Sequence, residues 1–570
     1  MAQVDGGRII CRVFKQEGVK DVHGIIGGHV GPISQGCMAE GIRLVGYRDE
    51  RGAAHAAEAY SRMTRKPAVA MVTAGVGVTN ATTGVASAMA DNIPLVVFGG
   101  RHSRIDEGRG ALQEMEGTLM FESITKWRRC IHEPVYMGFF TQQAFREAVA
   151  PSPGPVLIES CYDVLATPME EESINILPPH RYKSYSRPMG DPDYIERAVD
   201  MFLKAERPLI MAGDSVYWSE AAPELREFVE LLQVPVYTTK LGEGSYDEKG
   251  PLAVHRVMRS KFTRVTDVAM AIGVRFWRGE GYGDAPSIYN PNMNWIQVDP
   301  DAKRIGYNIT PEIGIVGDPK MVLRQMIECA KERIKEPRPK DTPWLNYFRE
   351  QRHAYEDAKE RDVKKVWDNK PIHPDRLTWE IVNWANEDAI FVLDGMQTAA
   401  FAERYVQARN YGQVIPLNNH GAQGPGVPWS VGAQLAQPNR QVICFEGDGS
   451  FGLGGFELET AARYELPIIV VVYNNNGWAG AAARMGQLPG DTKWAYVFRP
   501  NLRYDKVAQG LDCQGEYVEH PEEIRPALDR ARASGKPTLL NVMVDPAAAS
   551  PIYSGLGAAA SERKMKERFY

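Results

Sequence analysis

The sequence predicts an α/β protein made of three doubly wound domains, each with a parallel sheet covered by helices on both faces. Three observations lead to this fold. The chain has 570 residues, too long for one core, and at roughly 150 residues a domain it allows about three or four. Short apolar runs rich in β-branched residues alternate with segments of helical spacing, as in parallel sheets. The alternation falls into three blocks, at residues 6–165, 192–335 and 372–547.

The first domain is expected at residues 1–166. Its predicted strands lie in VHGIIGG, RLVGYRD, AVAMVTAG, IPLVVFGG and GPVLIES. Residues 167–191 are rich in Pro, Ser and charged residues and show no periodicity, so we expect a linker there.

The second domain is expected at residues 192–335, with strands in PLIMAGDS, VPVYTTK, DVAMAIGVRF and WIQVDP. The highly charged stretch from Lys331 to Asp368 indicates a helical connector with a solvated face. A third domain follows at residues 372–547. Residues 548–570 form a tail that ends in a basic cluster.

The stretch from Gln441 to Gly480 carries the clearest chemical signal. QVICFE and LPIIVVVY are typical of buried parallel strands, and GGFELETAARYE between them has helical spacing. The first strand ends in EGDGS, which offers a carboxylate and unhindered backbone N–H groups beside a helix N-terminus, where a phosphate is favoured. The second strand ends in NNNG at the same sheet edge, so oxygen ligands from both turns suit Mg²⁺ with a bound phosphate compound.

Composition excludes several classes of function. The net charge is −6 and the pI is near 6.1, which does not favour a nucleic-acid or anionic-membrane partner. The apolar runs are too short to span a bilayer and the first residues do not form a signal peptide, so we expect a cytoplasmic protein. The seven cysteines have no metal-binding spacing and are expected to be reduced.

The GDG sequence, with Asn475 placed 27 residues after its aspartate, resembles the diphosphate motif of the thiamine-diphosphate (ThDP) enzymes. The resemblance implies three Rossmann-like domains: a pyrimidine-binding domain, a central nucleotide-binding-like domain and a diphosphate-binding domain. It also implies that Asp448, the Asn475 side chain and the Gly477 carbonyl hold Mg²⁺. The other cofactor-binding residues that it implies in the third domain are Gly395, Gln397, Thr398, Gly421, Gln423, Gly449, Ser450, Gly477, Trp478 and Ala479. Gln423 stands where the family has a bulky apolar residue that bends the cofactor.

The first domain carries the catalytic residues that the resemblance implies. RDERGAAHAAEAYSR and TAGVGVTN are similar to the acetolactate synthase and oxalyl-CoA decarboxylase branch, and Glu50 matches the glutamate that protonates N1′ of thiamine. A plain helix N-terminal acid is the alternative. His29, in GGHVGPI, is expected to exchange the substrate hydroxyl proton, and Gln113, in ALQEM, to lie over the cofactor. The alternatives are a structural histidine and a polar loop residue. His55 and His102 are interpreted as structural.

GGHVGPI, ALQEM and the SGLG tail together look most like the 2-hydroxyacyl-CoA lyases, nearest to the actinobacterial 2-hydroxyisobutyryl-CoA lyases. The resemblance implies an acyl-CoA substrate, formyl-CoA as a product and a homodimer or homotetramer with sites between subunits. It also implies ADP or a CoA nucleotide, rather than FAD, near Gly213, Asp214, Arg275 and Asp299, a weak signal in any such domain. Ser554 would belong to a lid, although a frayed terminus is equally compatible.

Two other functions remain open. The first is an acetolactate-synthase-like or other 2-oxoacid or oxalyl-CoA decarboxylase or carboligase. The second is a catalytically silent subunit of the same fold, which is disfavoured because Glu50, Asp448 and Asn475 are all present.

Overall fold

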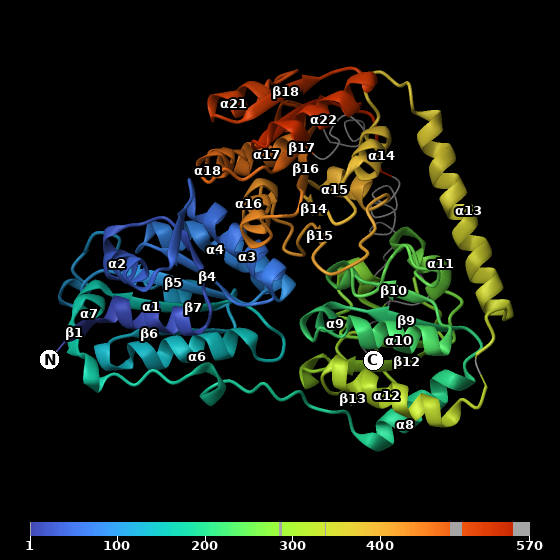
Figure 1. The fold of residues 1–570 in the computed structure, drawn as a ribbon, viewed down its shortest axis with the longest axis horizontal. Helices are drawn as coiled ribbons and strands as arrows, with labels where there is room; N and C mark the ends of the chain where they lie inside the picture. Colours follow the sequence, from blue (N-terminus) through green and yellow to red (C-terminus); the bar gives the residue numbers. More distant parts are fainter. Residues whose placement is uncertain (1, 284–287, 337, 479–492, 551–570) are drawn as a thin grey trace.

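The computed structural model describes residues 2–283, 288–336, 338–478 and 493–550 of the chain. Three parallel-sheet α/β units are seen in Figure 1: the N-terminal unit in blue, the central unit in green and the C-terminal unit in orange and red. The predicted fold class is confirmed. Within the described residues, every helix is too short or too polar to cross a membrane.

The N-terminal sheet has six parallel strands in the order β3-β2-β4-β5-β7-β6. The strands are β2 (Asp21–Gly24), β3 (Arg43–Gly46), β4 (Ala68–Val72), β5 (Leu95–Arg101), β6 (Trp127–Ile131) and β7 (Val156–Cys161). Helices cover both faces: α1 (Gly6–Gln16), α2 (Gly31–Glu40) and α6 (Met137–Val149) on one, α3 (Glu50–Thr64) and α4 (Val76–Asp91) on the other. The sequence pattern did not predict β6. WRRCI is an edge strand that pairs with a neighbour on one side only, so it can contain two arginines.

The C-terminal sheet repeats this topology. Its strands are β14 (Ile390–Leu393), β15 (Val414–Ile415), β16 (Val442–Gly447), β17 (Ile469–Asn474), β18 (Gln514–Val518) and β19 (Thr538–Met543). They lie in the order β15-β14-β16-β17-β19-β18, so each strand has a counterpart in the N-terminal sheet. The helix α16 (Gly426–Ala436), which enters β16, therefore corresponds to α3, which enters β4.

The central sheet has five parallel strands, ordered β10-β9-β11-β12-β13. They are β9 (Pro208–Ala212), β10 (Val236–Thr238), β11 (Val268–Ile272), β12 (Asn294–Asp299) and β13 (Ile313–Val316). Helices α8 (Pro192–Lys204), α10 (Ala222–Leu232) and α12 (Pro319–Arg333) pack their apolar residues on one face of this sheet. The short strand β13 was not predicted, because IGIV carries a glycine and lies at the sheet edge.

Two connections join the units. Residues 167–191 begin with β8 (Pro168–Glu170), which pairs antiparallel with β1 (Gln3–Asp5), and then run toward the central unit (Figure 1). The second connection is α13 (Pro343–Lys365), a 23-residue helix along one side of the molecule. Its charged length agrees with the predicted connector, but Trp344, Leu345 and Phe348 are buried and anchor its start to the central unit.

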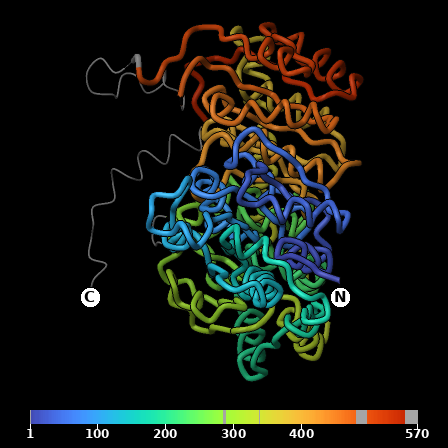
Figure 2. The backbone as a smooth tube through the Cα atoms, turned by 90° about the vertical axis from the view of Figure 1, so that its left-hand side faces the viewer, coloured from blue at the N-terminus to red at the C-terminus, as the bar shows by residue number. Residues whose placement is uncertain are grey.

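The N-terminal and C-terminal units pack through their equivalent helices α3 and α16. A Cβ on Gly432 of α16 would lie 2.1 Å from the Ala56 carbonyl oxygen of α3, so the helix backbones approach closely where no side chain intervenes. Figure 2 shows the C-terminal unit stacked above the other two. This packing fixes how the turns of the two equivalent sheets face one another.

Candidate active site

The two polar turns of the C-terminal sheet meet at one edge. Strands β16 and β17 are parallel neighbours, with Gly447 opposite Tyr473, so the turns that follow them are adjacent. The Asp448 carboxylate accepts the N–H of Gly477 at 3.0 Å through Oδ2 and that of Gly449 at 2.9 Å through Oδ1. The predicted metal-ligating residues are therefore brought together by backbone hydrogen bonds.

The electrostatics of this edge favour a cation. Asp448 is buried, and the loss of solvent raises its pKa to about 7, although N–H donors from Gly477 and Gly449 oppose the shift. No group of three or more His, Cys, Asp or Glu side chains that could hold a metal occurs within the described ranges. The available protein oxygens are the Asp448 carboxylate, the Asn475 amide and the Gly477 carbonyl. This sparse donor set suits Mg²⁺ completed by phosphate oxygens.

A pocket lies directly over these turns, and glycines keep it open. A Cβ on Gly447 would stand 3.6 Å from Thr398 Oγ1 and 3.7 Å from Ser450 Oγ, and Gly395 has a φ of +79°. Added side chains would fill the space that the hydroxyls face, so the residues present fit a diphosphate. The lining residues are Gly395, Met396, Gln397, Thr398, Gln423, Gly447, Asp448, Gly449, Ser450, Tyr473, Asn475, Gly477 and Trp478.

The predicted residue Gly421 does not line this pocket. Gly421 sits on an exposed loop next to it, with a φ of +79° and its N–H on the Asn418 carbonyl at 3.2 Å. Ala479 and Ser554 lie outside the described residues.

The predicted catalytic residues of the N-terminal unit converge on the turn between β4 and α4. The Thr73 hydroxyl lies 3.5 Å from His29 Nδ1. A Cβ on Gly75 would be 2.9 Å from Gln113 Cβ, and one on Gly77 would be 3.5 Å from Glu50 Oε1. Glu50, His29 and Gln113 thus surround residues 73–77, although they lie in three separate parts of the sequence.

Glu50 is the first residue of α3 and is buried. The preceding Asp49 is the N-cap, and its side chain accepts the Arg51 N–H at 2.7 Å, so Glu50 itself is not needed to cap the helix. Its Oε2 instead accepts a hydrogen bond from Asn80 Nδ2 at 3.0 Å. Asn80 belongs to the TAGVGVTN segment that pointed to this domain, but sequence reasoning assigned it no role.

The surroundings of His29 favour its neutral form. Burial and the nearby His102 lower its pKa, while a hydrogen bond with Gln113 acts in the opposite direction. His102 is buried, and among the described residues neither of its ring nitrogens has a hydrogen-bond partner, which distinguishes it from an ordinary structural histidine. Its Nε2 lies 3.7 Å from the Glu114 carboxylate. His55 packs against Trp429 and Glu58, as the structural interpretation expects.

Most of the candidate nucleotide-binding residues of the central unit form ion pairs within that unit. Asp214 lies 3.3 Å from both Arg275 and Arg304, and Asp299 lies 3.5 Å from Arg304. A Cβ on Gly213 would lie 2.0 Å from a backbone carbonyl oxygen, so this glycine serves strand packing. Arg275 stacks 3.5 Å over the Trp277 ring, and its Nη2 has no hydrogen-bond partner within the described chain.

Fold and pocket together fit an enzyme with a phosphate-bearing cofactor at the carboxyl edge of the C-terminal sheet. Models of three domains match the chain and specify the cofactor. They are described as the thiamine pyrophosphate enzyme N-terminal TPP binding domain at residues 4–120, central domain at 195–326 and C-terminal TPP binding domain at 394–542. The chain belongs to the thiamine pyrophosphate enzyme family.

Relatives with different activities match over nearly the whole length. The acetolactate synthase large subunit IlvG of Mycobacterium tuberculosis is 32% identical, over 96% of this chain and 97% of the relative. The 2-hydroxyacyl-CoA lyase 1 of Homo sapiens is 28% identical, over 96% and 95%, and the oxalyl-CoA decarboxylase of Escherichia coli K12 is 27% identical, over 96% and 96%. The predicted family is confirmed, and its branches give similar identities.

Proposed function

We propose that the protein is a ThDP-dependent carbon–carbon lyase that cleaves a 2-hydroxyacyl-CoA, such as 2-hydroxyisobutyryl-CoA, into formyl-CoA and a ketone or aldehyde. The observation that carries this proposal is the place of His29. It lies 3.5 Å from Thr73, in the turn of residues 73–77 that Glu50 also approaches, and its pKa is lowered. A neutral imidazole at that point is suited to accept the proton of a substrate 2-hydroxyl as the adjacent bond breaks.

Bound ThDP supplies the electron sink for the broken bond, which no side chain provides. In this proposal Glu50 exchanges a proton with N1′ of the aminopyrimidine, and Asn80 orients the carboxylate through its 3.0 Å hydrogen bond. Gln113 supports His29 in the proton transfer. The Gly421 carbonyl and the Gln423 side chain bind the aminopyrimidine.

Cofactor binding is assigned to the C-terminal edge. Asp448, Asn475 and Gly477 would hold Mg²⁺, and the glycine-lined pocket with Ser450 and Thr398 would hold the diphosphate. The unpartnered donor of Arg275 supports a phosphate group near the central sheet, from ADP or the CoA nucleotide of the substrate. Asp299 is less suited to contact a ribose, because it is fully buried beside Arg304.

We further propose a homodimer or homotetramer in which Glu50 of one subunit faces the cofactor held by another. The family resemblance supports this arrangement. Sedimentation of the purified protein with and without ThDP and Mg²⁺ tests it, and a monomer active at all concentrations would contradict it.

The second candidate is an acetolactate-synthase-like carboligase or another 2-oxoacid or oxalyl-CoA decarboxylase. It is favoured by the 32% identity to acetolactate synthase relatives. FAD in the central unit would accompany the acetolactate-synthase form and would colour the purified protein yellow.

The test is to incubate the protein, ThDP and Mg²⁺ with 2-hydroxyacyl-CoAs, 2-oxoacids and oxalyl-CoA, and to identify the products by mass spectrometry. Formyl-CoA with acetone from 2-hydroxyisobutyryl-CoA is the expected result. Carbon dioxide or acetolactate from 2-oxoacids, with the hydroxyacyl-CoAs intact, would contradict the lyase. His29→Ala should abolish cleavage while keeping ThDP affinity, and His132→Ala, on an exposed histidine, is the matched control.

A further inference from the structure

Two buried carboxylates join the N-terminal and C-terminal units at equivalent places in equivalent folds. Asp91 ends α4, which connects β4 to β5, and Glu457 ends the 3₁₀ turn η10 (Gly455–Glu457), between β16 and β17. Because the two sheets share one strand order, these two connections correspond to each other. Both side chains accept hydrogen bonds from the other unit, and the residues are 4% and 2% exposed.

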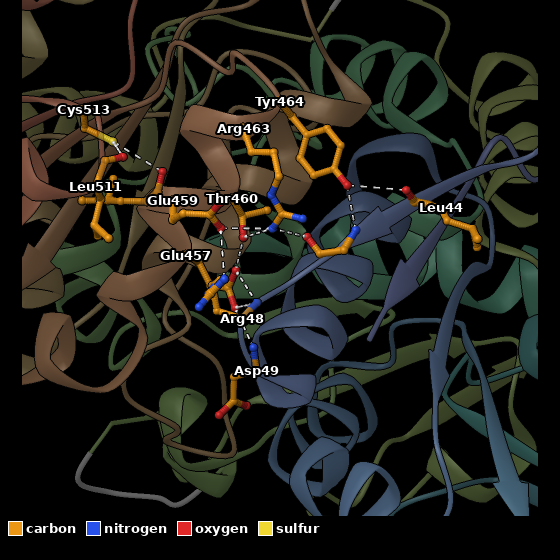
Figure 3. Close-up of polar contacts among 12 residues, drawn as sticks. Leu44, Arg48, Asp49, Glu457, Glu459, Thr460, Arg463, Tyr464, Leu511 and Cys513 are labelled. Carbon is orange, nitrogen blue, oxygen red and sulfur yellow. Dashed lines mark hydrogen bonds and ion pairs between the residues drawn. The ribbon is translucent and has the colours of Figure 1, made fainter. Parts of the chain in front are cut away.

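Glu457 contacts the turn that leads into Glu50 (Figure 3). Its Oε1 accepts the backbone N–H of Arg48 at 3.0 Å and that of Asp49 at 3.2 Å, and Oε2 accepts the Thr460 hydroxyl at 2.5 Å. These N–H groups precede a helix start and have no partner within the helix. A carboxylate from another unit therefore completes the N-terminus of α3.

Gly52 shows how closely Glu457 approaches α3. A Cβ on Gly52 would lie 2.4 Å from Glu457 Oε1, so the first turn of α3 must be free of a side chain on that face. The turn η10, which ends at Glu457, directly follows α17 (Asp448–Gly454), and α17 begins at the candidate metal-binding residue Asp448. One short segment thus links the diphosphate pocket of the C-terminal unit to the Glu50 turn of the N-terminal unit.

Asp91 makes the reciprocal contact. Its Oδ1 accepts both the backbone N–H of Asn419 at 3.0 Å and the side-chain Nδ2 at 2.8 Å. The neighbouring Asn418 exchanges two hydrogen bonds with Ala422, each 3.1 Å long, and thereby closes the loop that carries Gly421. Asp91 thus holds the loop that enters α16, as Glu457 holds the turn that enters α3.

We propose that Glu457 and Asp91 are a reciprocal pair of positioning residues. Each belongs to one unit and holds in place the turn that presents the cofactor-facing groups of the other unit. The proposal depends on the functions proposed above for Glu50 and for the loop of Gly421. In this proposal Glu457 keeps Glu50 in position, and Asp91 keeps the aminopyrimidine-binding loop in position.

The two units also pack through contacts that do not involve these carboxylates. The helices α3 and α16 are in direct contact, and Trp429 Nε1 of α16 donates to Glu58 of α3 at 3.0 Å. Loss of either carboxylate should therefore release one turn and leave the interface assembled. Glu457→Ala should impair the proton exchange that Glu50 performs, whereas Asp91→Ala should weaken cofactor binding.

The experiment compares Glu457→Ala and Asp91→Ala with two further variants of the holoenzyme. Thr460→Val is the milder variant, because it removes only the hydroxyl that steadies the Glu457 carboxylate and nearly preserves the side-chain shape. Glu459→Ala is the matched control, since Glu459 lies on the same segment and faces Arg48, but through an exposed ion pair of 3.9 Å. Glu457→Gln should behave like the wild type rather than like Glu457→Ala, because an amide oxygen can still accept both N–H groups.

Two readouts are used that need no substrate. Deuterium exchange at C2 of bound ThDP reports on Glu50, and the Kd of ThDP reports on the cofactor-binding loop. We expect Glu457→Ala to slow C2 exchange by about tenfold to a hundredfold with little change in Kd, as for a misplaced catalytic group. Asp91→Ala should instead raise the Kd. Thr460→Val should follow Glu457→Ala in direction with a smaller effect.

Backbone hydrogen exchange on the cofactor-free protein gives a third readout. Glu457→Ala should expose the amides of Arg48 and Asp49, and Asp91→Ala that of Asn419, each without affecting the other turn. The proposal is overturned if Glu457→Ala or Thr460→Val leaves the Arg48 and Asp49 amides protected, or if C2 exchange and Kd change in proportion in every variant. A failed lyase assay with normal C2 exchange would contradict only the proposed substrate.

Discussion

Asn80 Nδ2 donates a hydrogen bond to Glu50 Oε2 at 3.0 Å, which joins the second turn of α4 to the first residue of α3. The bond fixes which way the carboxylate points over the turn of residues 73–77. Asn80 is therefore placed to orient Glu50 for proton transfer.

Replacing Asn80 by Ala should slow C2 deuterium exchange of bound ThDP by up to about tenfold, because a hydrogen bond contributes roughly 0.5–1.5 kcal/mol. The Kd of ThDP should stay within a small factor of the wild-type value. Thr82→Ala on the same helix is the control. Unchanged exchange in Asn80→Ala would show that Glu50 is oriented by other groups.

Asp448→Asn should abolish Mg²⁺-dependent binding of ThDP while preserving the fold. The amide can still accept the Gly477 N–H, but the negative charge that attracts the cation is gone. Thermal unfolding should show no increase in Tm on adding ThDP with Mg²⁺, whereas the wild type at a hundredfold excess over Kd gains about 2.7 kcal/mol. Asp388→Asn, at an exposed aspartate, should behave as the wild type. A normal Tm increase in Asp448→Asn would place the cation elsewhere.

The stability of the cofactor-free protein should depend on pH through Glu457. Burial raises the pKa of this carboxyl from 4.5 to about 7, although bonds from Thr460 and the N–H groups of Arg48 and Asp49 oppose the shift. A carboxyl with a raised pKa binds its proton more tightly in the folded state, so it destabilises the fold above pH 7 and ceases to do so below its unfolded pKa.

The free energy of unfolding of the wild type, minus that of Glu457→Gln, should therefore rise as the pH falls from about 7 to about 4.5, by up to about 3 kcal/mol. Denaturant unfolding at several pH values measures this difference. Other acids that titrate in the same range cancel, because both proteins contain them. A difference independent of pH would mean that Glu457 has an ordinary pKa in the folded chain.

Cys130 should be the most reactive of the cysteines that the structure describes. A hydrogen bond from Cys161 and the Arg101 guanidinium, whose Nη1 lies 3.4 Å from the sulfur, lower its pKa to about 6 against the effect of burial. Burial raises the pKa of Cys444 and Cys513 instead.

Iodoacetamide at pH 7 should consequently modify Cys130 first, with a rate that rises with pH and levels off above about 7. Peptide mapping by mass spectrometry identifies the site. Arg101→Met should shift the midpoint of this profile to higher pH, and Arg109→Ala on the exposed loop should not. Equal labelling of Cys130 and Cys513 would refute the prediction.

The local sequence determined the buried strands and the polar turns that follow them. Buried strands such as β16 and β17 were predicted because continuous β-branched runs have few other stable arrangements. The glycine and acidic turns at Asp448 and Asn475 were predicted for the same local reason, since strand ends in open α/β sheets carry the ligand groups. Edge strands such as β6 were not predicted, because a strand that is less buried has a weaker hydrophobic pattern.

Tertiary structure decided how these local pieces serve one site. The sequence marked Glu50, His29 and Gln113 separately. Only the packing of α3, the turn after β2 and the long loop after β5 brings them around residues 73–77, which follow β4. Glu457 and Arg48 are 409 residues apart, and no periodicity or spacing could connect them. Their contact exists because two sheets with the same strand order pack through equivalent helices, and burial then makes each unpaired N–H group require a partner.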